Sequence, residues 1–83
     1  MSAVAAMRIT FGQWLKLRRG IAGLSQQAMA DAIGVTRQTV SNWERDRADV
    51  DPSFAAAQKM AAVFGVSLEV VAKGVRGEIE VDN

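Results

Sequence analysis

The fold is decided by LSQQAMADAIGVTRQTVSNWE, residues 24–44. This stretch contains two short segments whose apolar residues recur at helical spacing. Ser25 and Thr36 are typical helix N-caps, because their side-chain oxygens can accept hydrogen bonds from backbone N–H groups of the first turn. Gly34 supplies the positive-φ residue at which the first helix ends. The stretch therefore predicts two short helices joined by a tight turn.

The packing of these two helices requires a small residue where they cross, and Ala30 occupies that position one turn before the glycine. Val35 is a single apolar residue in the turn. Val40 and Trp43 form the inner face of the second helix, so its polar residues point outward. This pattern predicts a helix-turn-helix unit with a projecting second helix.

Similar signals extend in both directions from this unit. Thr10 is a candidate N-cap before an aromatic stripe, Asp51 and Pro52 are typical of a helix start, and Ser67 can cap a last helix. The sequence thus predicts an all-α, compact five-helix domain, with helices at residues 11–22, 25–33, 36–45, 52–64 and 67–73. The expected core contains Leu15, Met29, Ile33, Val40, Trp43, Phe54, Met60, Phe64 and Leu68.

The length of 83 residues allows one domain with one modest core. We expect residues 1–9 to form a flexible leader and residues 10–73 to form the helix-turn-helix domain. Residues 74–83 are an acidic tail that alternates apolar and charged residues, and they form either a dimerisation strand or a disordered end. Apolar residues between about 66 and 81 exceed what so small a core can bury, which predicts a two-fold interface there.

The composition argues against an enzyme. The chain has no cysteine and no histidine, which removes disulfides, imidazole bases and most transition-metal sites. Asp46, Asp49 and Asp51 lack the spacing, glycine and final glutamate of a calcium loop. We therefore expect no metal, cofactor or small-molecule ligand, and the uncharged runs are too short to span a membrane.

Basic residues are concentrated in the first part of the chain. Residues 1–47 carry seven basic and three acidic side chains, whereas residues 48–83 carry three basic and six acidic ones. The formal net charge of +1 is by itself weak evidence for a nucleic-acid partner. The asymmetry nevertheless indicates that one half can face a phosphate backbone while the other half faces away.

The stretch at residues 24–44 resembles the phage-repressor helix-turn-helix family, also described as Cro-like or XRE-like. Further matching features are Arg19 before the stretch, Pro52 after it, and FGVSL at residues 64–68. The resemblance extends from Phe11 to Val71. It implies a DNA-binding domain whose third helix enters the major groove.

The resemblance assigns the base-reading positions to the outer face of this third helix. Arginine can bond in a bidentate manner to guanine, and glutamine or asparagine to adenine. Any exposed helix carries polar residues, so the motif supports this interpretation more than the residue types do. The expected base-reading residues are Arg37, Gln38, Ser41 and Asn42.

The resemblance also assigns contacts with the DNA backbone, including one at the first turn of the second helix, where a helix N-terminus attracts phosphate. The expected phosphate-contacting residues are Gln26, Thr36, Thr39, Arg45 and Arg47. For the last two, a role as solvated surface charges is equally open.

Three other positions are assigned structural roles. Arg19 and Glu44 match a pair that in the family often forms a partly buried salt bridge between the first and third helices. Trp14 and Trp43 lie on apolar stripes, so we expect them in the core and not stacked on bases. At Asp46 the family usually has glycine; aspartate adopts the left-handed conformation less readily and adds a negative charge near the phosphates.

These features predict a sequence-specific DNA-binding protein, a repressor or autoregulator that binds a palindromic operator as a homodimer. The expected location is the cytoplasm, and the protein is expected to be bacterial or phage-encoded and nucleoid-associated when bound. The alternative is an antitoxin-like or scaffold module in which the same helices bind a protein partner. The modest net charge and Asp46 favour this alternative, whereas the polar face of the third helix favours DNA.

Overall fold

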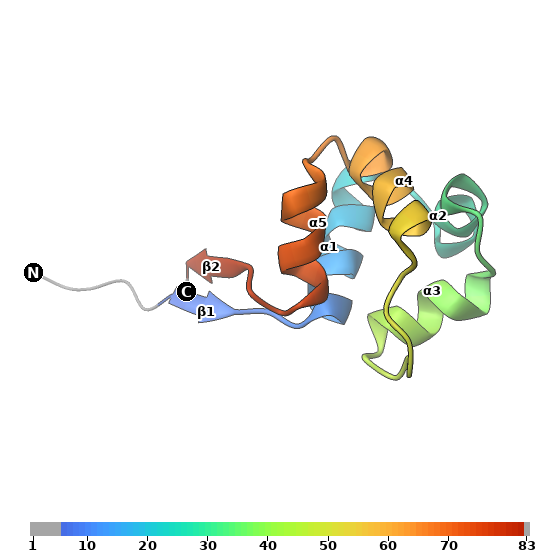
Figure 1. Cartoon of the computed structure of the whole chain (residues 1–83). Helices are drawn as coiled ribbons and strands as arrows, with labels where there is room; N and C mark the ends of the chain where they lie inside the picture. Colours follow the sequence, from blue (N-terminus) through green and yellow to red (C-terminus); the bar gives the residue numbers. More distant parts are fainter. Residues whose placement is uncertain (1–5, 83) are drawn as a thin grey trace, which may run out of the picture.

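The computed structural model describes residues 6–82 and shows five α-helices together with a small antiparallel β-ribbon (Figure 1). The elements in chain order are β1 (Ala6–Arg8), α1 (Phe11–Ala22), α2 (Gln26–Ile33), α3 (Arg37–Glu44), α4 (Phe54–Phe64), α5 (Leu68–Val75) and β2 (Glu80–Asp82). Residues 11–71 contain no strand. The predicted five-helix fold is confirmed.

Serine and threonine side chains fix where the helices begin. Each N-cap oxygen accepts a hydrogen bond from the backbone N–H three residues later, which satisfies one of the free donors of the first turn. The N-caps are Thr10, Ser25, Thr36, Ser53 and Ser67. The sequence located four of them, but the start of α4 is a correction, because Ser53 and not Asp51 caps it.

The end of α5 is a second correction. The last helix was expected to end at residue 73, but α5 continues to Val75 and Gly74 is buried within it. A Cβ atom added at Gly74 would lie 2.5 Å from ring carbons of Trp14. This glycine therefore allows the indole of α1 to pack directly against the backbone of α5.

The core lies where α1, α2 and α4 meet, with α3 and α5 on either side. It consists of the buried side chains Trp14, Leu15, Met29, Ala30, Ile33, Val40, Trp43, Met60 and Val71. Phe64 packs edge-on against Trp14, with ring centroids 5.7 Å apart. Three expected core residues differ: Phe64 and Leu68 are half-buried, and Phe54 is 67% exposed.

The ribbon joins the two ends of the described chain. Met7 pairs with Val81 and Arg8 with Glu80, and the backbone N–H of Ile9 donates to the carbonyl of Ile79 at 3.1 Å. Figure 1 shows the ribbon projecting from the helices at the end opposite α2. The expectation of a flexible leader is therefore wrong for residues 6–9, while residues 1–5 lie outside the described part. Of the two alternatives for the tail, a strand forms at residues 80–82.

No single helix within residues 6–82 is long and apolar enough to cross a membrane. The pair α4 and α5 together reaches that length and composition, but the two helices are bent by 114° relative to each other. Both contribute buried residues to the core, as the packed helices of a globular domain do.

Replacing Gly74 with alanine tests the contact between α1 and α5. We expect Gly74→Ala to lower the free energy of unfolding by about 1–3 kcal/mol, because the new methyl group overpacks the site beside Trp14. Gly20→Ala is the matched control, since Gly20 is also helical but has no neighbouring atom within 4 Å of the added Cβ. The control should gain about 0.5–1 kcal/mol from better helix propensity. Denaturant unfolding measures both, and equal gains would contradict the packing argument.

Candidate nucleic-acid interface

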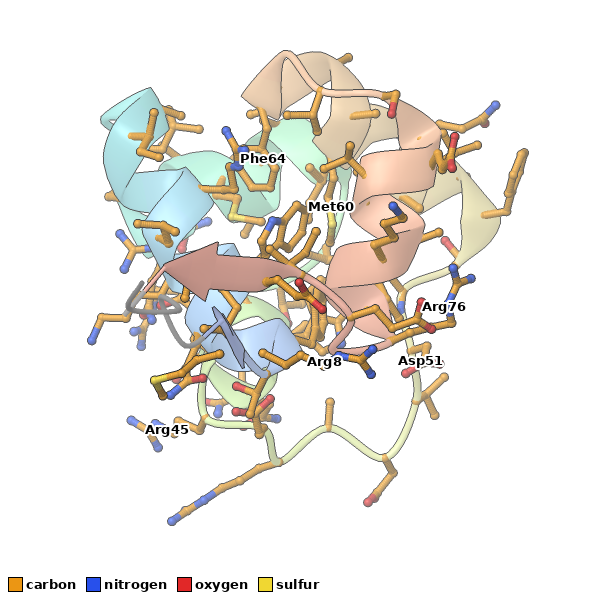
Figure 2. All side chains as sticks on the ribbon, turned by 90° about the vertical axis from the view of Figure 1, so that its left-hand side faces the viewer. Arg8, Arg45, Asp51, Met60, Phe64 and Arg76 are labelled. Carbon is orange, nitrogen blue, oxygen red and sulfur yellow. The ribbon has the colours of Figure 1, made fainter. Side chains whose placement is uncertain are left out.

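One side of α3 is buried and the other is free. Val40 and Trp43 face the core, where α3 contacts both α1 and α2. Gln38, Asn42 and Arg45 recur at spacings of four and three residues, so they follow one line along the opposite side. Arg45 extends from the body of the molecule into solvent (Figure 2).

Two of the expected base-reading side chains are bonded to each other. The Gln38 amide donates from Nε2 to the Asn42 Oδ1 atom at 3.0 Å. This bond leaves the Gln38 carbonyl oxygen and both amide hydrogens of Asn42 available for base edges. The pair therefore presents hydrogen-bond donors and acceptors in one fixed orientation. Adenine and the neighbouring base pairs expose complementary acceptors and donors in the major groove.

The other two expected base readers differ from each other. Arg37 is the first residue of α3 and is exposed. Ser41 is only 5% exposed. Its assignment from the sequence as a base-reading residue is therefore corrected. The buried face of α3 is wider than an apolar stripe through Val40 and Trp43 suggests, and Ser41 lies inside it.

The threonines at the start of α3 serve the helix itself. Thr36 Oγ1 accepts a hydrogen bond from the Thr39 backbone N–H at 3.1 Å, and the two hydroxyl oxygens lie 2.8 Å apart. Arg47 is exposed, and its backbone N–H donates to the Asn42 carbonyl at 2.9 Å. These residues lie at the two ends of α3.

A buried ion pair ties α3 to α1. Arg19 Nε lies 2.6 Å from Glu44 Oε2, and the two side chains are only 18% and 4% exposed. A second bond runs from the Arg19 guanidinium to Glu44 Oε1 at 3.1 Å, and a third to the carbonyl of Leu24 at 2.8 Å. The structure thus brings together the two residues that the family resemblance paired.

Gln26 also joins this cluster. Its Nε2 atom donates to Glu44 Oε1 at 3.2 Å, so in the free protein one amide hydrogen points at the ion pair and the other stays available. This bond could not be predicted from the sequence, because it depends on how α2 and α3 cross. The cluster consequently connects three helices through one carboxylate.

The hydrogen bond that Arg19 donates to Glu44 raises the pKa of Arg19, burial lowers it, and the negative charge of Glu44 raises it further, so the net change is an increase. A folded-state pKa above the unfolded value means that the stabilisation is complete at lower pH and is lost only as pH rises through the folded value. Arginine titrates far above neutrality. Its contribution to stability is therefore constant across the physiological range.

Asp46 has a role that the sequence did not reveal. It adopts a positive φ of 54°, the conformation for which the family usually has glycine. Its carboxylate accepts hydrogen bonds from the Gly12 backbone N–H at 2.8 Å and from the Thr10 hydroxyl at 2.7 Å. The negative charge therefore lies at the N-terminus of α1, where a helix dipole favours it.

Gly12 makes this approach possible. A Cβ atom there would lie 2.6 Å from the Trp43 carbonyl oxygen and 2.7 Å from that of Glu44. The first turn of α1 consequently abuts the last turn of α3, with free N–H groups of one helix near free carbonyls of the other. Beyond this contact, Trp43 Nε1 donates to the Val50 carbonyl at 3.2 Å and holds the following loop.

Residues 15–71 match the model of the helix-turn-helix family. This chain belongs to that family. The match covers α2, the turn, α3 and most of the supporting helices, so the described face of α3 is the outer face of a helix-turn-helix second helix.

Known relatives agree with this assignment. The chain is 36% identical over 72 residues to an uncharacterised HTH-type transcriptional regulator, YonR, from the SPbeta prophage of Bacillus subtilis. This alignment covers 87% of the chain but 65% of that relative, so the chain spans less than two thirds of its length.

Solved structures share the fold. The crystal structure of SinR, a regulator of biofilm formation, in complex with DNA superimposes with a TM-score of 0.66 at 30% identity, covering 76% of this chain and 98% of that one. The DNA-binding domain of the P22 c2 repressor gives a TM-score of 0.69 at 22% identity, covering 82% and 87%. The second likeness concerns the fold alone.

Removing Glu44 tests the buried ion pair. We expect Glu44→Ala to lower the free energy of unfolding by about 3–5 kcal/mol, because Arg19 is left as an unpaired, partly buried charge. Glu78→Ala is the control, since Glu78 pairs with Arg76 at 2.8 Å but both side chains are about half exposed, at 41% and 57%. The control should change stability by less than about 1 kcal/mol. Similar melting curves for the two variants would refute the proposed importance of burial.

Two substitutions at Asp46 separate its hydrogen bonds from its backbone conformation. Both Asp46→Ala and Asp46→Gly lose the bonds to α1, so both should unfold more easily than the parent protein. The alanine variant should be less stable than the glycine variant by about 1 kcal/mol, because only glycine adopts the left-handed conformation without cost. Chemical unfolding of all three proteins measures this difference. A glycine variant as stable as the parent would show that the carboxylate bonds contribute nothing.

Proposed function

We propose that this chain is a transcriptional regulator that binds a specific double-stranded DNA sequence, with α3 in the major groove. The observation that carries this proposal is the Gln38–Asn42 amide pair, held outward on a helix whose inner side is fixed to α1 and α2. Such a pair offers donors and acceptors in a fixed arrangement, which is what direct readout of base edges requires.

The fixed position of α3 supports its proposed role in reading base edges. The Arg19–Glu44 pair holds α3 against α1 on one side, and the contact between Gly12 and the end of α3 holds it on another. A reading helix fixed in this way loses little freedom on binding, so more of its contact energy remains as affinity. Arg37 adds a group suited to guanine at the start of the helix.

Contacts with phosphate are proposed for the residues that surround α3. Arg45 and Arg47 are exposed at its end, and the N-terminus of α2 carries Gln26 with one free amide hydrogen. The charge of Asp46 is directed to α1, so it opposes DNA binding less than its position in the sequence suggests. Thr36 and Thr39 remain candidates through their hydroxyl groups.

The proposed site of action is a short palindromic operator that two copies bind together, with the outcome of repression or autoregulation. A dimer places two α3 helices about 34 Å apart, one turn of DNA. We propose a cytoplasmic protein that is nucleoid-associated when bound and uses no cofactor. Selection of bound sequences from a random duplex library tests both specificity and symmetry, because an enriched palindrome requires both.

A protein-interaction module of the antitoxin or scaffold type is the second candidate. Leu17 and Ile21 are exposed on α1, at 49% and 67%, and such an apolar pair suits a protein partner. The two candidates differ in salt dependence, since binding to random duplex DNA weakens steeply with salt when phosphates are neutralised. A chain that binds no duplex at low salt would support this second candidate.

Substitutions on α3 test the reading face. Gln38→Ala and Asn42→Ala should each lower specific affinity by about 1–3 kcal/mol and relax the preference at one base pair of each half-site. Because the two amides are bonded to each other, the double variant should lose less than the sum of the single losses. Binding to specific and random duplexes across a salt series measures these effects.

Phosphate-contacting residues should behave differently in the same assay. Arg45→Ala or Arg47→Ala should reduce the salt slope by about one unit, and Gln26→Ala should weaken all sequences alike with little change in that slope. Equal losses on specific and random duplexes for both the Gln38 and Asn42 variants would remove α3 as the reader.

A further inference from the structure

A pocket adjoins the end of α3. It has a volume of about 340 Å³, which is within the range of about 300–1,000 Å³ that small-molecule sites occupy. Four segments form its walls: the start of α1, the end of α3, the loop after α3 and the end of α5 (Figure 1). The pocket therefore lies beside the contacts that hold the end of α3 against α1.

Aromatic and branched side chains form the apolar part of its wall. The rings of Phe11 and Trp43 both line the pocket, with centroids 6.0 Å apart and planes tilted by 60°. Val50 and Val75 extend this wall from the loop and from α5. Val50 is 76% exposed, so apolar surface remains in contact with water. A ligand with an apolar part gains free energy by covering that surface.

The polar part of the lining has an excess of negative charge. Asp46 and Asp51 supply two carboxylates and Arg76 supplies one guanidinium, whose charge is offset by Glu78 at 2.8 Å. Asp46 is already bonded to the first turn of α1. The Asp51 side chain, in contrast, is exposed and forms no salt bridge within residues 6–82. Asp51 is therefore the group that can receive a cation.

We propose that this pocket binds a small organic amine, with its ammonium group at Asp51 and its apolar part against Phe11 and Trp43. A carboxylate accepts strong hydrogen bonds from an ammonium group, and the faces of aromatic rings attract it as well. An anion would meet two carboxylates, and a neutral ligand would leave the charge of Asp51 unpaired. A metal ion would leave the apolar wall in water.

The position of the pocket makes the amine an effector of α3. Trp43 Nε1 donates to the Val50 carbonyl at 3.2 Å, and Asp46 accepts from the Gly12 backbone N–H at 2.8 Å. A ligand between α1, the loop and α5 favours the arrangement in which both contacts are formed. The amine and duplex DNA then stabilise the same position of α3, so each strengthens the binding of the other. This role rests on the proposed DNA-binding function.

Titration of the full 83-residue chain with phenethylamine at neutral pH tests the pocket. The chain has two tryptophans, and their indole N–H signals in NMR spectra report separately, because Trp43 lines the pocket and Trp14 is in the core. We expect a saturable shift of the Trp43 signal, with a dissociation constant of about 1 mM or lower, and a much smaller change for Trp14. No saturable shift of Trp43 would overturn the proposal.

Phenethyl alcohol is the matched ligand control, because it has the same apolar part without the charge. It should bind about tenfold more weakly than the amine, since it cannot form a charge-assisted bond with Asp51. Equal affinities of the alcohol and the amine would overturn the assignment of a cationic ligand.

Two substitutions in the loop test the position of the ammonium group. Asp51→Asn should weaken amine binding about tenfold, because it removes the charge of the bonding partner. Asp49→Asn is the control, since Asp49 is also exposed in this loop but does not line the pocket. Both variants lose one negative charge, so a general effect of net charge is the same in each. Equal effects of the two substitutions would overturn the role of Asp51.

A DNA-binding assay separates the pocket from the proposed function. Saturating phenethylamine should strengthen binding to the selected duplex about fivefold, at the low end of typical coupling between two sites, and should have no such effect on Asp51→Asn. An amine that binds at Asp51 in a protein that binds no duplex would overturn the DNA-binding function alone. Duplex binding without a saturable Trp43 shift would overturn the pocket alone. An amine that binds but leaves duplex affinity unchanged would overturn its role as an effector.

Discussion

The arrangement of the domain depends on one buried ion pair, Arg19 with Glu44. Charges lose hydration when they are buried, so such a pair is stable only when its geometry is good and its remaining polar atoms are bonded. Here the Arg19 guanidinium also donates a hydrogen bond to the carbonyl of Leu24, and the Glu44 carboxylate also accepts one from the side-chain amide of Gln26. The pair therefore fixes α1, α2 and α3 relative to one another, and the angle at which α3 projects follows from it.

The end of α3 is held by a second, smaller contact. Because Gly12 has no side chain, the first turn of α1 comes close to the last carbonyls of α3. Asp46 follows this turn and bonds back to α1. An acidic residue at a position where the family usually has glycine thus keeps the required backbone conformation and adds an attachment. The outer face of α3 needs no further support, which leaves Gln38 and Asn42 free to bond to each other and to a ligand.

Features that depend on neighbours in the sequence could be predicted. Serine and threonine caps, the glycine at position 34 and the apolar periodicity located the five helices, because these signals act within one or two turns. The outward position of Gln38 and the ion pair of Arg19 followed from the motif. What the sequence could not supply was the width of each buried face, which depends on how helices cross. Ser41 is buried and Phe54 exposed for this reason, and the roles of Gly74 and Asp46 required the contact partners from distant helices.

The β-ribbon has a consequence for how the chain folds and opens. Arg8 pairs with Glu80, so the ribbon closes a loop that contains all five helices. Closing so long a loop costs conformational entropy, and two three-residue strands form only a few hydrogen bonds to offset that cost. The ribbon therefore forms after the helices have packed, and it is the first part of the molecule to open in a local fluctuation. Its amide hydrogens should exchange with solvent while those of α1 and α3 are still protected, so both ends of the described chain can detach without disturbing the helices that carry the site.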